Sequence, residues 1–572
     1  MNSKYIQGSI FFTGILALLA FFSAEKNSPK TKSRSEREYI PCAPPASENI
    51  TANEYGRFAP IFPGWGHHSY TITTGMDSAQ FFFNQGLTMY YSYHAKEAVA
   101  SFKEAARLDP QSAMAYWGQA LAMGPNYNFA HYYKMKPWVP EIVENMKKNA
   151  GTASAKEKDL IAAMSERYST DSTNKDRESL NAAYAKSMHA LVSKYPEDLD
   201  IKALYVDAVM LQHVWDFWHN DGKPQGWTPE LVSLCENILA KNPEHPGALH
   251  YYIHVTEASR HPEKALKSAD ILRQLLPGVA HMVHMSSHVY ERTGLYAEGV
   301  QVNDKADDDL VMYETIGRQL ALGKHATHYF AVQSFCAISG GIYKEGLQKA
   351  TRCRNSVTPT YEDADGQYTF MMPVFAKVRM GKWKEILNEE TEPDRNWVYA
   401  SLLSDFANGL AQLRMNNIPQ AKRRLDSLRY KMKDTILKVR DIPFNSAYQG
   451  AYIAERILNA SILFDEGKSK EAILQFEDGI KMEDSLIYSE PRDWILPCRQ
   501  YLGAVLLKLK RPEEAEKVYR DDLLFTPGNG WSLLGLYQSL VAQHKNEEAR
   551  QYRALYEKAF AAADELPKAS VY

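Results

Sequence analysis

The sequence predicts an all-α protein built from stacked helical hairpins. Amphipathic helix periodicity, interrupted by Pro or Gly, runs from about residue 77 to the C-terminus without convincing strand alternation. Characteristic residues also recur at a step of 34 residues, as Pro243 and Pro277 do. Because each hairpin leaves an apolar face that only its neighbour can cover, such units must stack into an array.

The composition agrees with a long folded array. A chain of 572 residues exceeds what one compact core usually supports, and 45% hydrophobic with 24% charged residues is typical of folded proteins. The net charge of −3 attracts no polyanion, so we expect no nucleic-acid partner. The five cysteines form no C-x-x-C pair, which excludes a zinc knuckle and a dense disulfide framework.

The N-terminal residues 1–24 are predicted to be a signal peptide or a short membrane anchor. Their apolar run 8–24 follows Lys4, which is the layout of a secretory signal. The basic residues after the run resist translocation, so a membrane-anchored form stays open beside a periplasmic or secreted one. Residues 25–60, rich in Ser, Pro, Lys and Glu, are predicted to be a flexible tether.

Residues 61–572 are predicted to form the repeat array. The first unit has the residues that the tetratricopeptide repeat (TPR) pattern requires at positions 8, 20, 24, 27 and 32: Gly86, Ala98, Phe102, Ala105 and Pro110. The pattern returns at Gly503, Ala515 and Pro527, within predicted C-terminal repeats 440–572. TPR hairpins stack into a solenoid, here expected as a right-handed superhelix, whose first helices line a concave groove.

One unit carries an insertion. Between Pro196 and Pro243 the step is 47 residues, which is 34 plus 13. The extra residues include Trp215, Trp218 and Trp227, and we predict a structured loop at a helix junction.

Histidines recur in register with the repeat. Two copies of H-x3-H-x2-E are offset by 34 residues: His250, His254 and Glu257, then His284, His288 and Glu291. Spacings of four and three residues place the side chains of each copy on one helix face. In the TPR register they occupy positions 5, 9 and 12 of a first helix, which point into the groove.

Three further residues belong to the same predicted face. His281 is at position 2 of the second copy, Asp207 is at position 9 of the preceding unit, and His328 is near position 2 of the following unit. The groove near residues 207–328 is therefore the predicted functional site. Imidazoles and carboxylates that converge suit a divalent transition metal such as zinc, copper, nickel or iron.

The pattern leaves three functions open. The preferred one is a binding scaffold that captures a metal ion, or a ligand through that ion. The second is a metal-dependent hydrolase or oxidase, with Glu257 or Glu291 as acid or base. The third is an adaptor for envelope or polymer-processing proteins that holds a peptide without metal. A zincin protease is excluded, because no Glu follows His250 or His284.

Several segments resemble a family of large, exported bacterial TPR proteins over nearly the whole chain after the tether. They are Gly66-His67-His68, Phe83-Asn84-Gln85-Gly86-Leu87, residues 113–118, residues 249–254, residues 284–288 and the corner Pro527 to Trp531. The resemblance implies the TPR fold and the shared His pattern, but no established activity. Relatives often have Pro where this chain has Ser286 and Cys where it has Ser112, and neither difference affects the helix-face argument.

Overall fold

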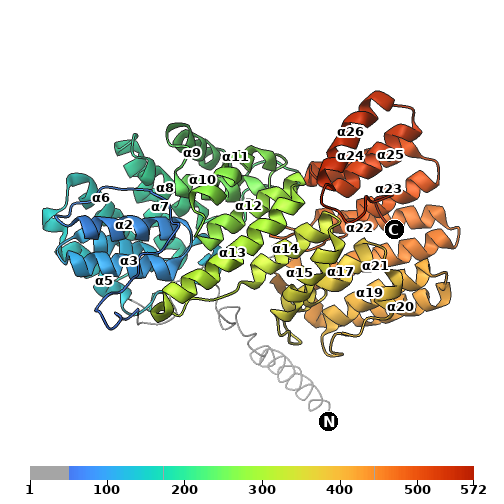
Figure 1. Cartoon of the computed structure of the whole chain (residues 1–572), viewed down its shortest axis with the longest axis horizontal. Helices are drawn as coiled ribbons and strands as arrows, with labels where there is room; N and C mark the ends of the chain where they lie inside the picture. The colour runs from blue at the N-terminus through green and yellow to red at the C-terminus, as the bar shows by residue number, and fades with distance from the viewer. Residues whose placement is uncertain (1–49, 172, 175, 443–444) are drawn as a thin grey trace, which may run out of the picture. The chain divides into compact units, whose positions relative to one another are not determined.

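The computed structural model describes residues 50–572 except 172, 175, 443 and 444, and in this part the predicted all-α TPR repeat solenoid is confirmed (Figure 1). Successive helices pack as hairpins joined by short turns. Among the described residues the strands are β1 (Arg440–Ile442) and β2 (Asn445–Ser446), which form one short antiparallel pair.

The first half of the described chain contains these helices: α2 (Asp77–Tyr91), α3 (Ala95–Leu108), α4 (Ala113–Ala122), α5 (Val139–Lys148), α6 (Ala155–Glu166), α7 (Arg177–Lys194), α8 (Leu199–Met210), α9 (Thr228–Lys241), α10 (Pro246–Glu257), α11 (Leu266–Leu275), α12 (Ala280–Thr293), α13 (Tyr296–Ile316), α14 (Thr327–Ser339) and α15 (Tyr343–Asn355).

The second half contains these helices: α16 (Ala364–Phe370), α17 (Met372–Arg379), α18 (Trp383–Leu387), α19 (Val398–Arg414), α20 (Ile418–Lys431), α21 (Ala447–Asp465), α22 (Ser469–Asp484), α23 (Cys498–Lys508), α24 (Pro512–Phe525), α25 (Gly530–Ala542) and α26 (Asn546–Ala559). The short 3₁₀ helices are η3 (Tyr127–Tyr132), η4 (Ala150–Thr152), η5 (Pro262–Ala265), η6 (Arg318–Leu320) and η7 (Thr435–Lys438).

An aromatic ring between two glycines fixes the approach of neighbouring hairpins. Phe102 of α3 packs against Gly86 of α2 and Gly118 of α4. A Cβ atom would lie 2.8 Å from the Phe102 ring at Gly86 and 2.2 Å from it at Gly118. Only glycine therefore permits this separation of α2, α3 and α4.

The same contact recurs near the C-terminus. Tyr519 of α24 packs against Gly503 of α23 and Gly535 of α25, where a Cβ atom would lie 2.3 and 2.2 Å from the ring. The two glycines of each contact are 32 residues apart in the sequence. The TPR positions predicted around Gly86 and Gly503 are thus the positions at which the hairpins touch.

The packed chain begins before residue 61. Ile50 and Ala59 are buried in the same core as α2 and α3, and the backbone N–H of Phe58 donates to Glu104 of α3 at 2.8 Å. Residues 50–60 therefore pack on the first hairpin instead of forming a flexible tether, because their apolar side chains find a surface to cover. The predicted signal peptide or anchor and residues 25–49 lie outside the described residues.

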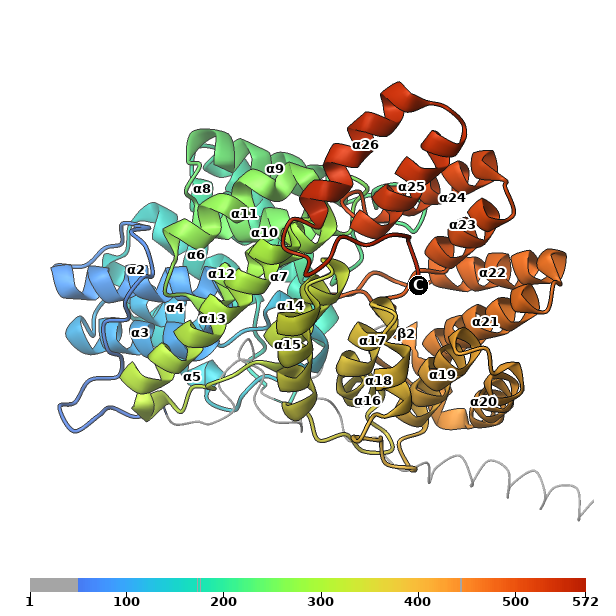
Figure 2. The ribbon, with the colours of Figure 1, turned by 45° about the vertical axis from the view of Figure 1, so that its right-hand side comes forward.

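The C-terminal repeats contact the middle of the chain. Helices α23 to α26 are drawn in red, above and to the right of α12 and α14, in two views (Figure 1, Figure 2), and the corner before α25 contacts the ends of α12 and α14. The backbone N–H of Gly528 donates to the carbonyl oxygen of Arg292 at 3.1 Å, and Trp531 Nε1 donates to the carbonyl oxygen of Ser339 at 2.8 Å. These contacts bring the segment between α22 and α23 next to α10 and α12.

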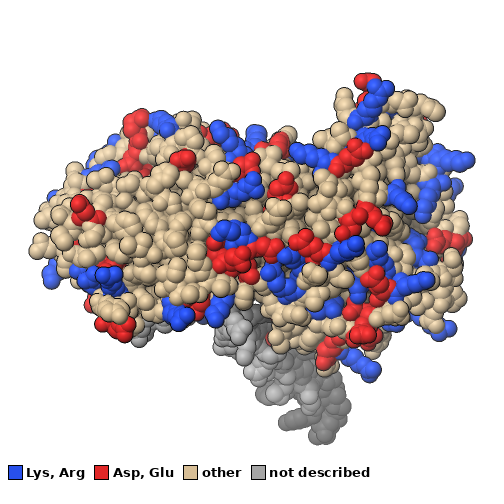
Figure 3. Space-filling model, in the orientation of Figure 1, with Lys and Arg blue, Asp and Glu red and all other residues tan. Residues whose placement is uncertain are grey.

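Charged side chains of both signs are interspersed on the face shown in Figure 3, mainly over its middle and right-hand parts. This mixture agrees with the net charge of −3. In the described part of the chain, every helix is too short or too polar to cross a membrane.

We expect Gly118→Ala to lower the free energy of unfolding by about 1–3 kcal/mol, because the buried Phe102 ring cannot move away from the added methyl group. This cost exceeds the gain of about 1 kcal/mol from alanine's helix propensity. Chemical denaturation measures the change. Gly75→Ala is the control, since a Cβ atom there meets nothing within 4 Å. Equal stability of the two variants would contradict the close contact.

Candidate metal centre

Two groups of three histidines lie between α10, α12 and α14. In each group two histidines come from the first helix of one hairpin, and the third comes from the first turn of the first helix of the next hairpin. Site 1 contains His250, His254 and His281, and site 2 contains His284, His288 and His328. Within each site, one nitrogen of every ring lies within 4.8 Å of the others. Five of the six residues are buried and His328 is the least buried.

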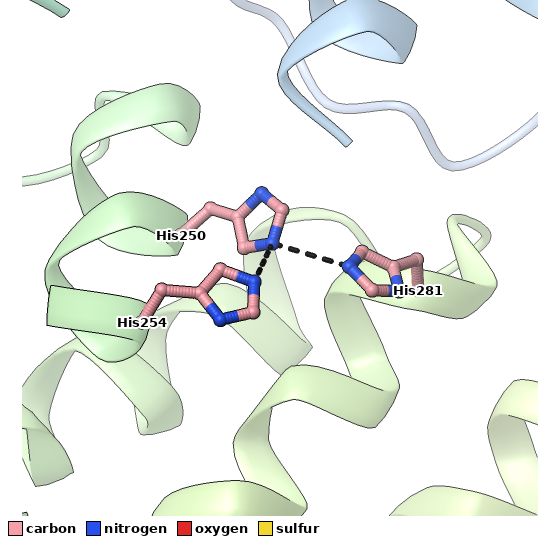
Figure 4. Close-up of side chains that lie close together, drawn as sticks. All are labelled: His250, His254 and His281. Atoms are coloured by element: carbon pink, nitrogen blue, oxygen red, sulfur yellow. Dashed lines mark hydrogen bonds between the residues drawn. The ribbon is translucent and has the colours of Figure 1, made fainter. Parts of the chain in front are cut away.

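In site 1 the three rings point toward one another from α10 and α12 (Figure 4). Nε2 of His250 lies 3.1 Å from Nε2 of His254 and 3.2 Å from Nε2 of His281. Nδ1 of His250 donates to the carbonyl oxygen of Tyr91 at 2.6 Å, and Nδ1 of His254 donates to Oε1 of Glu257 at 3.0 Å. Because neutral imidazole has one N–H, both Nε2 atoms present lone pairs.

Site 2 repeats this arrangement. Nε2 of His284 lies 2.9 Å from Nε2 of His288, and the His328 ring centroid lies 4.8 Å from that of His284. Nδ1 of His284 donates to Oδ1 of Asn303 at 2.6 Å. The Asn303 amide nitrogen donates to the carbonyl oxygen of Gly299, which fixes the amide's orientation and leaves Oδ1 as the acceptor.

A carboxylate pair links the two sites. Glu257 accepts from Nδ1 of His254 through Oε1 and from Nδ1 of His288 through Oε2, at 3.0 and 2.8 Å. Oε2 of Glu490 lies 3.2 Å from Nδ1 of His288, and its Oε1 accepts from Trp215 Nε1 at 2.9 Å. Carboxylates on the far nitrogen of a metal-binding histidine orient the ring and raise its basicity.

Burial sets the protonation of most rings. It lowers the pKa of four of them, helped by neighbouring imidazoles: His250, His254, His281 and His284. The pKa of His254 falls to about 4, so this ring is neutral at neutral pH. Burial also acts to lower the pKa of His288, but the carboxylates of Glu490 and Glu257 outweigh it and raise that pKa well above its usual value.

The nitrogen separations fit a bound metal ion. With metal–nitrogen distances of about 2.0–2.1 Å, two ligands of a tetrahedral ion lie about 3.3 Å apart. The Nε2 pairs of sites 1 and 2 are separated by 3.1 and 2.9 Å. Aromatic rings enclose site 1: Tyr93 and Tyr127 lie 4.5 and 4.7 Å from the ring centroids of His250 and His254. The arrangement therefore offers one enclosed imidazole site and a second that is accessible at His328.

Two of the predicted ligands lie elsewhere. Asp207 accepts from the Tyr90 hydroxyl at 2.5 Å and belongs to neither site. Oε2 of Glu291 has no hydrogen-bond partner among the described residues, and α14 has Phe335 at the position that corresponds to His288 of α12. Burial raises the pKa of Glu291 to about 7. The predicted side chains do not line an accessible concave groove, since all of them except His328 are buried.

Sequence reasoning did not find Glu490. It lies more than 200 residues beyond His288, in an inter-helix corner whose sequence indicates only a turn and an aromatic packing residue. No periodicity connects it to the His motifs, and only the contact of the C-terminal repeats with α12 places it there.

A further group differs in its protonation. Nδ1 of His245 accepts from the backbone N–H of Ala248, so Nε2 carries the proton and lies 3.5 Å from Asp200. Asp200 also accepts from His68 Nε2 and from the Tyr91 hydroxyl at 2.9 and 2.8 Å. The hydrogen-bond donors of this network all face the carboxylate of Asp200. The network therefore caps the start of α10 through His245 and needs no bound ion.

Comparison with known proteins gives a likeness of fold only. No protein-family model matches the sequence, and no curated protein matches it. Similar solved structures include a human IFIT1 dimer with m7Gppp-AAAA (12% identity, TM-score 0.31, 86% of this chain and 92% of that chain) and yeast Tom70 (12%, 0.28, 85% and 90%). The P58(IPK) TPR domain is another (13%, 0.18, 59% and 92%). These TM-scores carry no inference about ligand or activity.

We expect the urea midpoint of chelator-treated protein to fall as the pH decreases from about 6.5, the usual histidine value, toward the pKa of about 4 of His254. A ring with a lowered pKa binds its proton mainly after unfolding, so acid favours the unfolded state. His288 has a raised pKa and acts in the opposite sense, because its stabilisation is lost as the pH rises through that pKa. The carboxyl groups of Glu291 and Glu483, whose pKa values are raised to about 7, also oppose the effect, so the contribution of the four rings is measured against a variant that lacks two of them.

The matched variant is His250→Gln/His281→Gln, which removes two of the four rings with lowered pKa values. Its midpoint should depend less steeply on pH over this range. The same slope in both proteins would show that these imidazoles do not control the acid response.

Proposed function

We propose that the protein binds two divalent transition-metal ions, one in each His triad, within its TPR-type scaffold. One observation carries the proposal. In each site two Nε2 atoms face each other at 3.1 or 2.9 Å, while the Nδ1 protons of the same rings are donated to oxygen acceptors. In site 1 both facing atoms hold lone pairs, which repel at this distance unless a cation lies between them. In site 2 the raised pKa of His288 supplies a proton between the two atoms, and a metal ion would displace that proton.

Hydrogen bonding among the rings is a weaker explanation of site 1. His250 and His254 each donate through Nδ1, so neither has a second proton to give while it stays neutral. Burial keeps their pKa values low, which disfavours adding that proton. A proton on Nε2 of His281, 3.2 Å away, satisfies the lone pair of His250 but leaves Nε2 of His254 facing it as a second acceptor, whereas a metal ion accepts electron pairs from both rings at once.

Ligand type limits the choice of ion. Imidazole nitrogens suit zinc, copper, nickel or iron better than calcium or magnesium, which prefer oxygen. Three protein ligands leave a position open on a four-coordinate ion. That open position favours capture of an exogenous ligand, and it is the observation behind a second candidate function, a metal-dependent oxidase or hydrolase. Glu257 is an unfavourable base for such an enzyme, because both of its carboxylate oxygens already accept hydrogen bonds from histidines.

The apolar run 8–24, outside the described residues, supports export as part of the same proposal, to the periplasm or medium or to a membrane-anchored position. An exported scaffold of helical repeats would present the metal sites to a protein or peptide partner.

Metal analysis of purified protein should give two ions per chain. The variants His250→Ala/His281→Ala and His284→Ala/His328→Ala should each retain one, because each removes two ligands from one site only. His261→Ala is the control, since this exposed side chain lies outside both sites. Negligible metal in the wild type, or two ions in both double variants, would end the proposal. X-ray absorption of the wild type provides a second check through a nitrogen shell at about 2.0 Å.

Glu257→Gln should weaken both sites together, by about 10- to 100-fold in affinity, because one carboxylate orients a ring of each site. Two ions should still bind at saturating metal. Glu263→Gln is the control, a substitution of an exposed carboxylate beside His261. Loss of an ion at saturation would instead place the metal between His254, Glu257 and Glu490, whose ligand atoms also lie within 4.8 Å of one another.

A further inference from the structure

A cavity of about 520 Å³ lies next to the linking carboxylates Glu257 and Glu490. Their neighbours in the sequence, Ala258 and Ser489, form part of its wall. Its wall combines the loop of the predicted insertion, between α8 and α9, with the segment between α22 and α23 and the ends of α12 and α24. Trp215, which donates to Glu490, belongs to this wall. The volume is within the range of small-molecule sites in proteins.

Four arginines line the cavity: Arg260, Arg292, Arg492 and Arg499. Arg499 is neutralised by a two-point contact with Asp484, at 2.6 and 2.8 Å. Among the residues that the structure describes, no carboxylate lies at ion-pair distance from the other three. Arg292 donates to backbone carbonyl oxygens, including that of Ser259 at 3.2 Å.

The three unpaired guanidinium groups repel one another. Burial lowers the pKa of Arg492 and the charge of Arg292 lowers it further, while Glu483 and Asp522 oppose the shift without reversing it. The pKa of Arg260 is also lowered, by burial and by the charges of Arg492 and Arg292. Fixed like charges in one cavity cost free energy unless an anion is bound there.

The nearby carboxylates are already engaged. Glu483 accepts from the backbone N–H of Cys498 at 2.8 Å, and Asp522 accepts from the hydroxyl of Ser532 at 2.5 Å. Burial and the charge of Asp522 raise the pKa of Glu483 to about 7, so this group is only partly charged at neutral pH. Asp216 and Asp493, also in the wall, accept from Gln225 at 2.7 Å and from Asn445 at 2.5 Å.

The wall also has polar side chains, such as those of Asn220 and Ser489, and a set of large apolar or aromatic ones: Val214, Trp215, Trp218, Leu486, Ile487, Trp494 and Phe525. Phe525 lies among the arginines. The guanidinium carbon of Arg260 is 3.6 Å from its ring centroid, and those of Arg499 and Arg492 are 4.9 and 5.5 Å away. The cavity therefore has guanidinium groups that can bind an anion and, beside them, aromatic side chains on which a flat apolar group can pack.

We propose that this cavity binds a small organic anion, with its carboxylate or phosphate group at Arg260, Arg292 and Arg492 and an aromatic or other apolar body against the tryptophans. This site does not depend on the metal proposal, although Trp215 and Arg292 connect the two. Arg292 donates to the backbone carbonyl oxygen of Glu257.

The probe is 2-naphthoate, compared by calorimetry with the neutral 2-naphthamide and with inorganic phosphate. We expect one naphthoate per chain, bound at least tenfold more tightly than either comparison compound. Arg492→Gln should weaken naphthoate binding at least tenfold, whereas Arg550→Gln, which alters an exposed arginine paired with Glu547, should leave it unchanged. Circular dichroism and metal content check that both variants are folded.

If naphthamide binds as tightly as naphthoate, the ligand need not be an anion and the proposal is wrong. If phosphate binds as tightly, an apolar group does not contribute to binding and that part of the proposal is wrong. Unchanged naphthoate affinity in Arg492→Gln would overturn the location. The His284→Ala/His328→Ala variant separates this site from the metal. Naphthoate binding as in the wild type supports a separate cavity, and its loss there would mean that the carboxylate binds a metal ion instead.

Discussion

The close packing of successive first helices is the constraint on which the rest of the structure depends. It brings imidazoles about one repeat apart in the sequence to nitrogen separations near 3 Å, as between His250 and His281. The separation of hairpins is set by contacts such as Phe102 between two glycines, where no side chain intervenes. A repeat protein with bulkier residues at these positions could carry the same histidines and still hold them too far apart to share an ion.

Burying so many titratable groups is unfavourable unless each is hydrogen-bonded. The protein meets this condition at Nδ1 of four rings with acceptors of different kinds: a backbone carbonyl for His250, an amide for His284 and a shared carboxylate for His254 and His288. The shared carboxylate makes the sites a coupled pair, because its position affects one ring of each. Glu490 adds a second negative charge beside His288, which accounts for the raised pKa of that ring alone.

The C-terminal repeats have a role beyond extending the array. In an ideal solenoid each unit contacts only its neighbours, but here the corner at Gly528 packs on the end of α12. This contact positions Glu490 against the histidines and arranges Arg492 and Phe525 around the cavity. The proposed metal ligands and the proposed anion-binding side chains are therefore neighbours, separated by the linking carboxylates and Trp215. An organic anion in the cavity would lie close to the metal sites without displacing a histidine.

The sequence by itself determined the repeat, its 34-residue step and the helix face shared by His250 and His254, because helical periodicity and small-residue positions are local properties. It also identified the third ring of each site, His281 and His328, through the same register. Tertiary structure decided which nitrogen of each ring faces its neighbours, that Glu257 orients rings while Glu291 and Asp207 do not, and that the site is buried. Those outcomes depend on Tyr91, Asn303 and Glu490, whose positions follow from the packing of segments far apart in the chain and leave no periodic signal.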